Sequence, residues 1–298
     1  MKLSKNTILV TGATGFLGSH LVKALVSLDQ NIIILIRENS GTHRLKSVLS
    51  NIHCYCISSL NLYDGVSKPF IEYKNIDIII HCATDYGHNN DIVNVFAANN
   101  ILPIYLLQLA NRYNVPVFIN TDTVLSAEVN AYALSKQQFI EWVLYFINDR
   151  IKRFINFKIE NFYGSDDNEA KFVNYVIKSC MENQKSILLT QGEQIRDFIY
   201  IEDVVAAYIT ILQNLHQLSL GFSQYDVTTG DPVSIRQFVE IVKQLTGCAT
   251  QLDFGALPYR VNEKMNTDTD ATALRALGWN CKYSLKQGIL KMMQNLKI

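Results

Sequence analysis

A tyrosine and a lysine four positions apart, Tyr132 and Lys136, are the residues of this 298-residue sequence whose types and spacing best suit chemistry. On a helix, residues i and i+4 lie on the same face. A cation beside a phenol stabilises the phenolate and lowers the tyrosine pKa from about 10, so that the tyrosine can exchange a proton with a carbonyl oxygen. The pair alone is a weak motif. It gains weight because it opens a predicted helix just after a strand that ends at Thr121.

Three glycines, Gly12, Gly15 and Gly18, recur at intervals of three between a strand pattern and a helix pattern. Glycine permits a tight turn and lets the free N–H groups at a helix N-terminus approach a pyrophosphate. The spacing G-x-x-G-x-x-G is a variant of the common dinucleotide fingerprint, and an ordinary loop is the alternative. The strand before the turn and the helix after it favour a dinucleotide site.

The residue at the end of the second predicted strand bears on which dinucleotide binds. NAD sites of this architecture usually place an acid there, about 20 residues after the glycines. Here the strand ends in Arg37, with Arg44 nearby, and a guanidinium pairs well with the extra 2′-phosphate of NADP. Glu38 argues in the other direction, and Arg37 is alternatively a solvated strand end. We therefore predict NADP(H), with NAD as the less favoured cofactor.

Short Ile- and Val-rich runs alternate with helical periodicity in the first half of the chain, which predicts an α/β fold with a Rossmann-type doubly wound parallel sheet. The predicted strands are Thr7–Val10, Asn31–Ile36, Ile52–Ile57, Ile76–Cys82, Val115–Asn120 and Arg153–Ile159, and the predicted helices are Phe16–Leu28, Val93–Tyr113 and Tyr132–Asn148. We expect residues 1–163 to form an NADP-binding domain to which 196–215 return, and 164–195 with 216–298 to form a smaller α/β substrate lobe.

After residue 163 the pattern predicts four helices and two strands, of which one helix and one strand lie in the returning segment 196–215. They are Lys171–Asn183, Asp203–Gln213, Ser234–Thr246 capped by Ser234, a C-terminal helix from Ser284, and the strands Ser186–Thr190 and Phe198–Ile201.

The composition excludes several classes of partner and site. Lys and Arg together number 27, as do Asp and Glu, so nothing in the bulk charge indicates binding to nucleic acid. No apolar run reaches the roughly 18 residues of a spanning helix, and the N-terminus lacks a secretory apolar segment, so we expect a cytoplasmic protein without a membrane partner. The six cysteines are expected to be reduced and mostly buried, and Cys54 and Cys56 lack the second pair that a zinc site needs, so no metal is predicted.

Taken together, these motifs resemble the extended short-chain dehydrogenase/reductase family over essentially the whole chain. The resemblance implies a catalytic set of Thr121, Tyr132 and Lys136, with Thr121 bonding the substrate oxygen beside Tyr132. It implies a cofactor site made of the glycine turn and of residues on later elements, namely Gly12, Thr14, Gly15, Phe16, Leu17, Gly18, Arg37, Ala83, Asn99, Tyr132 and Lys136. A second register gives the hydroxyl role to Thr123, which we keep as a substrate contact. The interval from Thr121 to Tyr132 is short for this family.

The same resemblance implies a nucleotide-diphosphate sugar as substrate. Two arginines, Arg196 and Arg260, would bind the diphosphate, each with a surface salt bridge as the alternative. The other implied substrate contacts are Tyr86, His88, Thr123, Asn161 and Lys171, and a polar loop is the alternative for Tyr86 and His88.

The residues after Thr121 separate the reactions that this scaffold supports. Nucleotide-sugar 4,6-dehydratases of the family carry Asp-Glu there, whereas this chain has Asp122-Thr123, and the cysteine of epimerase-reductases is absent too. The resemblance therefore implies an NADP-dependent 4-ketoreductase of a nucleotide-linked deoxyhexose, closest to enzymes that reduce CDP-4-keto-3,6-dideoxyglucose for O-antigen. A dTDP-4-keto-6-deoxyglucose reductase and a non-catalytic NADP-binding regulator remain as alternatives.

Family members are commonly homodimers, which implies pairing through the helices Val93–Tyr113 and Tyr132–Asn148. The aromatic residues Tyr105, Phe139, Trp142 and Tyr145 of those helices suit either such an interface or packing on the sheet.

Overall fold

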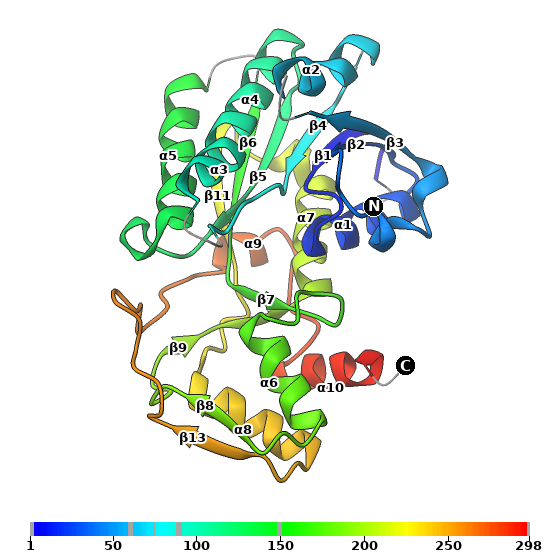
Figure 1. The fold of residues 1–298 in the computed structure, drawn as a ribbon. Coiled ribbons are helices and arrows are strands. Elements are labelled where there is room, and N and C mark those ends of the chain that lie inside the picture. Colours follow the sequence, from blue (N-terminus) through cyan, green and yellow to red (C-terminus); the bar gives the residue numbers. More distant parts are fainter. Residues whose placement is uncertain (1–2, 59–61, 74, 88–90, 148–150, 297–298) are drawn as a thin grey trace. The chain divides into compact units, whose positions relative to one another are not determined.

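The computed structural model describes residues 3–58, 62–73, 75–87, 91–147 and 151–296 (Figure 1). The chain divides into two compact units. Unit 1 comprises Met1–Lys158 and Tyr208–Tyr225, and unit 2 comprises Ile159–Ala207 and Asp226–Ile298. The prediction that the first region binds the cofactor and the second binds the substrate stays a prediction.

A seven-stranded parallel sheet, in the order β11-β6-β5-β4-β1-β2-β3, confirms the predicted doubly wound α/β fold. Its strands are β1 (Thr7–Thr11), β2 (Asn31–Arg37), β3 (Ile52–Ile57), β4 (Ile78–His81), β5 (Val117–Thr123), β6 (Arg153–Ile159) and β11 (Gly221–Val227). The central strands are continuous apolar runs because helices cover both faces of such a sheet. Val10 is paired with Ile34 and Ile80, and Ile80 with Ile119, so the carboxyl ends of these strands lie side by side at one end of the sheet.

The helix that carries Tyr132 and Lys136 is fixed to this sheet by aromatic packing. Phe118 of β5 stacks on Phe154 of β6 at 5.0 Å between ring centroids, and Phe154 stacks on Phe222 of β11 at 5.9 Å. Phe139 of α5 (Ala131–Phe146) is buried against Phe118 and Phe154. Tyr132, Lys136 and Phe139 are spaced i, i+4, i+7, so the face that packs on the sheet also directs the chemical pair toward it.

The remaining helices of unit 1 agree with the predictions except for one omission. They are α1 (Phe16–Ser27), α2 (Leu62–Glu72), α3 (Ile92–Phe96), a π-helical turn (Ala97–Ile101) and α4 (Leu102–Arg112). Figure 1 shows α4 and α5 side by side over one face of the sheet. Helix α2 was not predicted because Gly65 and Pro69 lie inside it and both disfavour helices. Gly65 is useful there, since a Cβ would lie 3.1 Å from the Cα of Ile57.

The expectation that no apolar run has spanning length was wrong for one segment. The helical run Ile92–Arg112 has 21 residues and a hydropathy of 1.5, which is long and apolar enough to cross a membrane by length and composition alone. Leu106, Leu107 and Ala110 of this run are buried in the core of unit 1. Packing within unit 1 therefore accounts for part of its apolar character, while Ile92, Val93 and Phe96 at its start are exposed.

Unit 2 is built from short strand pairs covered by helices. β7 (Asn161–Tyr163) pairs with β10 (Phe198–Tyr200), β8 (Ser186–Leu189) with β13 (Gln251–Phe254), and β9 (Ile195–Arg196) with β12 (Val233–Ser234). The helices are α6 (Phe172–Met181), α8 (Ile235–Thr246), α9 (Thr272–Arg275) and α10 (Leu285–Leu296), while α7 (Ile201–Asn214) belongs partly to each unit.

The predicted cap of α8 is confirmed. Ser234 Oγ accepts a hydrogen bond from the Gln237 N–H at 3.0 Å, and the Gln237 side chain accepts one from the Ser234 N–H at 2.9 Å.

Five strands were not predicted, namely the sheet strand β11 and the short strands β7, β9, β12 and β13. Segments such as Gly221–Val227 are too polar to give a strand pattern.

All six cysteines are free thiols. The expectation that they are mostly buried was wrong for Cys54 and Cys56, which are exposed because β3 is an edge strand of the sheet. Cys180 and Cys248 are buried.

Candidate active site

The glycine turn joins β1 to α1 and leaves room for a ligand against the backbone. Gly12 has φ +67°, and a Cβ there would lie 2.5 Å from the nitrogen of Ala83. A Cβ on Gly18 would lie 2.2 Å from the carbonyl oxygen of Gly12. Gly15 is exposed, and it precedes the first residue of α1, Phe16, without a side-chain cap. An uncapped helix N-terminus next to a glycine turn fits a pyrophosphate, whose oxygens accept hydrogen bonds from the free N–H groups.

The other predicted residues of this turn contribute packing and one polar contact. Phe16 and Leu17 are buried, so the start of α1 is anchored in the core. Thr14 is half-buried, and its carbonyl oxygen accepts a hydrogen bond from Arg44 Nη1 at 3.4 Å. Arg37 is exposed at the end of β2. Of the two arginines, Arg44 is the one that contacts the glycine turn.

Asn99 lies in the π-helical turn and links the loop after β4 to α5. Its Oδ1 accepts from the Asp85 N–H at 2.8 Å, and its Nδ2 donates to the Asp85 carbonyl at 2.8 Å and to Ser135 Oγ at 2.9 Å. Ala83, in the same loop, donates its N–H to Thr11 Oγ1 at 3.3 Å. The prediction did not include Ser135, which joins Asn99 to the helix of Tyr132.

Lys136 is almost fully buried, and its ammonium group lies at the end of β5. Nζ donates a hydrogen bond to the carbonyl oxygen of Thr121 at 2.9 Å. Burial lowers the pKa of Lys136 to about 8, while the nearby Asp122 and Cys82 favour its charged form. Lys136 therefore titrates close to neutral pH.

Tyr132 faces Tyr86 and Thr123. Its ring centroid is 5.0 Å from that of Tyr86, and its phenol hydrogen-bonds the Thr123 side chain. Burial raises the pKa of Tyr132, and Tyr86 and Asp122 raise it further. The expected lowering of the Tyr132 pKa by Lys136 was wrong for this structure, because burial dominates and the lowering contribution comes from the hydrogen bond with Thr123. A raised pKa keeps Tyr132 protonated, which suits a proton donor.

The two candidate hydroxyls, Thr121 and Thr123, have different partners. Thr121 Oγ1 lies 2.7 Å from Tyr208 OH and donates to Cys82 Sγ at 3.3 Å. The structure therefore brings Thr123, not Thr121, to the Tyr132 phenol. Tyr208 was missed by the sequence reasoning. Its place on the apolar face of α7 indicates burial, but nothing in the sequence indicates its partner.

The short interval between Thr121 and Tyr132 contains no extended loop. β5 ends at Thr123, a 3₁₀ turn covers Ala127–Val129, and Asn130 Oδ1 then caps α5 by accepting the Ala133 N–H at 2.8 Å. The cap places Tyr132 in the first turn of its helix.

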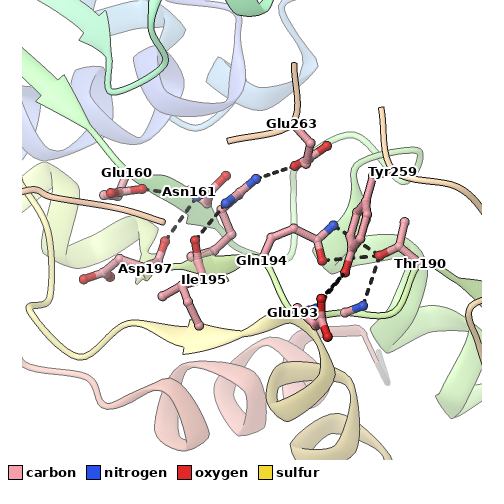
Figure 2. A network of polar contacts seen from close by, with 11 residues as sticks. Glu160, Asn161, Thr190, Glu193, Gln194, Ile195, Asp197, Tyr259 and Glu263 are labelled. Carbon is pink, nitrogen blue, oxygen red and sulfur yellow. Dashed lines mark hydrogen bonds and ion pairs between the residues drawn. The ribbon is translucent and has the colours of Figure 1, made fainter. Parts of the chain in front are cut away.

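In unit 2, Arg196 already has an anionic partner. Its Nη2 forms a short ion pair with Glu263 Oε1, and its Nη1 donates to the Ile195 carbonyl at 2.8 Å. Both side chains of the ion pair are mostly buried, at 15% and 19% exposed. Figure 2 shows Glu263 in this contact, close to a second contact between Glu193 and Tyr259. The predicted diphosphate ligand would have to share or replace the Glu263 carboxylate.

The other predicted substrate residues are spread over both units. Asn161 is exposed and donates to Glu160 Oε2 at 3.2 Å, and Arg260 is exposed. Lys171 forms an ion pair with Asp167 at 2.9 Å. These three residues lie in unit 2, whereas Tyr86 and Thr123 lie in unit 1. His88 lies outside the described residues.

Solved structures share the fold over almost the whole chain. UDP-glucose 4-epimerase of Thermotoga maritima, solved with UDP-glucose, superposes with a TM-score of 0.84 at 22% identity and 98% coverage of each chain. UDP-glucose 4-epimerase of Thermus thermophilus, solved with NAD, gives a TM-score of 0.83 at 21% identity, covering 98% of this chain and 99% of that one. At these identities the likeness establishes the fold.

Sequence relatives are more similar. The chain is 32% identical to CDP-abequose synthase of Salmonella typhimurium over 99% of its own length and 100% of the relative, and 33% identical to CDP-abequose synthase of Salmonella muenchen over 96% of each. The family model for the NAD dependent epimerase/dehydratase family matches residues 8–221. The resemblance predicted from the sequence is thereby confirmed, and this chain belongs to the NAD dependent epimerase/dehydratase family.

Proposed function

We propose that this protein reduces the 4-keto group of a nucleotide-linked deoxyhexose with NADPH. The observation that carries the proposal is the group formed by half-buried Tyr132 with buried Thr123 and Lys136 at the end of β5, in the unit that also holds the glycine turn. A protonated phenol beside a second hydroxyl suits delivery of a proton to a carbonyl oxygen.

Tyr132 provides that proton, and Thr123 orients the carbonyl oxygen toward it. Lys136 places a positive charge beside the phenolate that remains, which stabilises the charge that develops during the reaction. When bound, the nicotinamide supplies the hydride to the carbonyl carbon, so the products are a secondary alcohol and the oxidised cofactor. Asp122-Thr123 lacks the glutamate of the dehydratases, which supports a single reduction.

NADP(H) is the proposed cofactor because two arginines follow the glycine turn where an acid would favour NAD. The contact of Arg44 with the Thr14 carbonyl makes it the better positioned of the two for a 2′-phosphate, with Arg37 beside it in sequence. In unit 2, Arg196 and Arg260 are the proposed diphosphate ligands, and Asn161 and Lys171 further substrate contacts.

The names of the two Salmonella relatives support CDP-4-keto-3,6-dideoxyglucose as the substrate, and with it a role in O-antigen sugar synthesis. The test offers CDP- and dTDP-linked 4-ketosugars side by side, each with NADPH and with NADH, and records cofactor oxidation at 340 nm. We expect the fastest turnover with the CDP-sugar and NADPH. A preference for the dTDP-sugar would change the proposed nucleobase of the substrate from cytosine to thymine. Cofactor binding without oxidation on any ketosugar would favour the alternative of a non-catalytic NADP-binding regulator.

A homodimer is also proposed, through α3 and α5, which contact each other. Exposed apolar side chains on the two helices are Ile92, Val93, Phe96, Leu134, Trp142, Leu144 and Tyr145. Such a concentration of exposed apolar side chains is typical of a subunit interface. Phe139, in contrast, is buried in the core, so it belongs to the packing on the sheet.

A further inference from the structure

Asp122 is a buried carboxylate between two residues of the candidate site, and the proposed reaction has not used it. It is 9% exposed. Its Oδ1 accepts the Thr123 N–H at 2.7 Å, and its Oδ2 accepts Asn156 Nδ2 at 2.8 Å. Among the described residues no ion pair within 4.0 Å includes Asp122. Both carboxylate oxygens are thus held by neutral donors, and the charge is compensated from farther away.

Lys136 is the cation that compensates this charge, since Asp122 favours the charged form of Lys136. Its ammonium group binds the carbonyl of Thr121, which belongs to the peptide bond that joins Thr121 to Asp122. Other titratable groups near Lys136 are His81 at the end of β4 and Cys82 directly after it, with Tyr208 of α7 adjoining Cys82, and Tyr132 on its own helix. Burial raises the pKa of Cys82 to about 11 and lowers that of His81, so both are neutral near pH 7. Of these titratable residues, Asp122 is the one with a carboxylate.

We infer that Asp122 is a positioning residue that keeps Lys136 charged, and that it does not itself donate a proton to the substrate. The inference deepens the proposed function and rests on it. Hydrogen bonds from Thr123 and Asn156 hold the carboxylate in place, so it stabilises the ammonium group without a contact that would withdraw Lys136 from Thr121. A dehydratase of this family uses an aspartate at this position as an acid, together with a neighbouring glutamate. This chain has the aspartate without the glutamate, and the aspartate contributes only its charge.

Asp122→Asn removes the charge and can preserve the geometry. Asn120 Nδ2 donates to Asn156 Oδ1 at 2.8 Å, and Asn120 Oδ1 has no hydrogen-bond partner among the described residues. If the amides of Asn156 and Asn120 both turn over, the new amide at position 122 donates to Asn156 and still accepts the Thr123 N–H. Gln224, which accepts weakly from Asn156, is exposed and free to rotate with them.

The first measurement is the pH dependence of kcat/KM for ketosugar reduction. Activity requires charged Lys136, so it is present below the lysine pKa and lost above it. Without Asp122 this pKa falls, and we expect the alkaline limb of Asp122→Asn to move at least about 1 pH unit lower, with near wild-type activity at low pH. Asp77→Asn is the matched control, because Asp77 also accepts a backbone N–H, from Thr7 at 2.8 Å, but at the amino end of the strands. Its profile should match the wild type.

An unchanged alkaline limb in Asp122→Asn would overturn the inference. So would an equal loss at every pH, because a lower lysine pKa predicts a loss that grows as the pH rises. Asp122 also raises the pKa of Tyr132, so removing it moves the tyrosine in the same direction. A readout specific to the lysine is therefore needed.

That readout is an NMR titration of protein labelled with ¹³C at lysine Cε, with the Lys136 signal assigned from Lys136→Met. We expect the Lys136 pKa to fall in Asp122→Asn and to stay unchanged in Asp77→Asn. No shift in Asp122→Asn contradicts the inference. Because the titration needs no substrate, a fall in the lysine pKa in a protein that reduces no ketosugar would support the inference while rejecting the proposed function.

Discussion

The charged residues of the candidate site are held in different ways in units 1 and 2. In unit 1, Lys136 binds a backbone carbonyl, and Asp122 is held by neutral N–H donors. In unit 2, Arg196 and Lys171 are each paired with a carboxylate. The arrangement in unit 1 can receive an uncharged carbonyl without exchanging partners. In unit 2 the proposed diphosphate would compete with a carboxylate, so its affinity would depend on how easily that carboxylate is displaced.

The largest expected effect comes from the glycine turn of unit 1, and a glycine of unit 2 provides the control. Gly12 and Gly247 have nearly the same φ, +67° and +65°, but only a Cβ on Gly12 meets other atoms. We expect Gly12→Ala to cost about 2–4 kcal/mol of stability and to weaken NADPH binding at least about 100-fold. Gly247→Ala should cost about 1 kcal/mol and leave NADPH binding unchanged.

Thermal unfolding and calorimetric titration measure both quantities. If Gly12→Ala bound NADPH as well as Gly247→Ala does, the turn would not be the pyrophosphate site.

A smaller effect separates the two hydroxyls of unit 1. Thr123→Val removes the hydrogen-bond partner of Tyr132. We expect kcat to fall about 10- to 100-fold, because the variant loses a hydrogen bond to a group on which charge develops during the reaction. Thr121→Val should have a lesser effect, because the Thr121 hydroxyl bonds Tyr208 and Cys82. The opposite order of the two variants would support the role for Thr121 that the family pattern predicts.

The smallest expected effect tests the competition in unit 2. Glu263→Gln removes the carboxylate from Arg196, and we expect the affinity for CDP to rise about 3- to 10-fold. Asp268→Asn is the control, since Asp268 lies in the same segment, is 88% exposed and pairs with Lys264. Weaker binding of CDP by Glu263→Gln would instead mean that Glu263 orients Arg196 for the ligand.

The elements that carry the chemistry of unit 1 were predictable because their patterns are local. Apolar runs such as Asn31–Ile36 fixed the strands, and the i, i+4 spacing of Tyr132 and Lys136 placed both on one helix face. The choice between Thr121 and Thr123 was not predictable. It depends on the direction of each side chain at the end of β5, and on Tyr208, which is distant in sequence.

In unit 2 the sequence indicated which residues are charged but not how they pair. The partner of Arg196 is 67 residues away, and nothing local to Arg196 points to Glu263. Helix α2 and the strand β11 were missed for a related reason: their sequences are poor formers of their structures, and packing within unit 1 supplies the stability that propensity lacks.

The most direct test of the central claim follows a label from cofactor to sugar. Wild-type protein is incubated with NADPH deuterated at the transferable position of the nicotinamide and with the CDP-linked 4-ketosugar, and the product is examined by NMR. The account predicts deuterium at C4 of the sugar, at a rate that falls about 10²- to 10⁴-fold in Tyr132→Phe. Deuterium absent from C4, or full turnover by Tyr132→Phe, would contradict it.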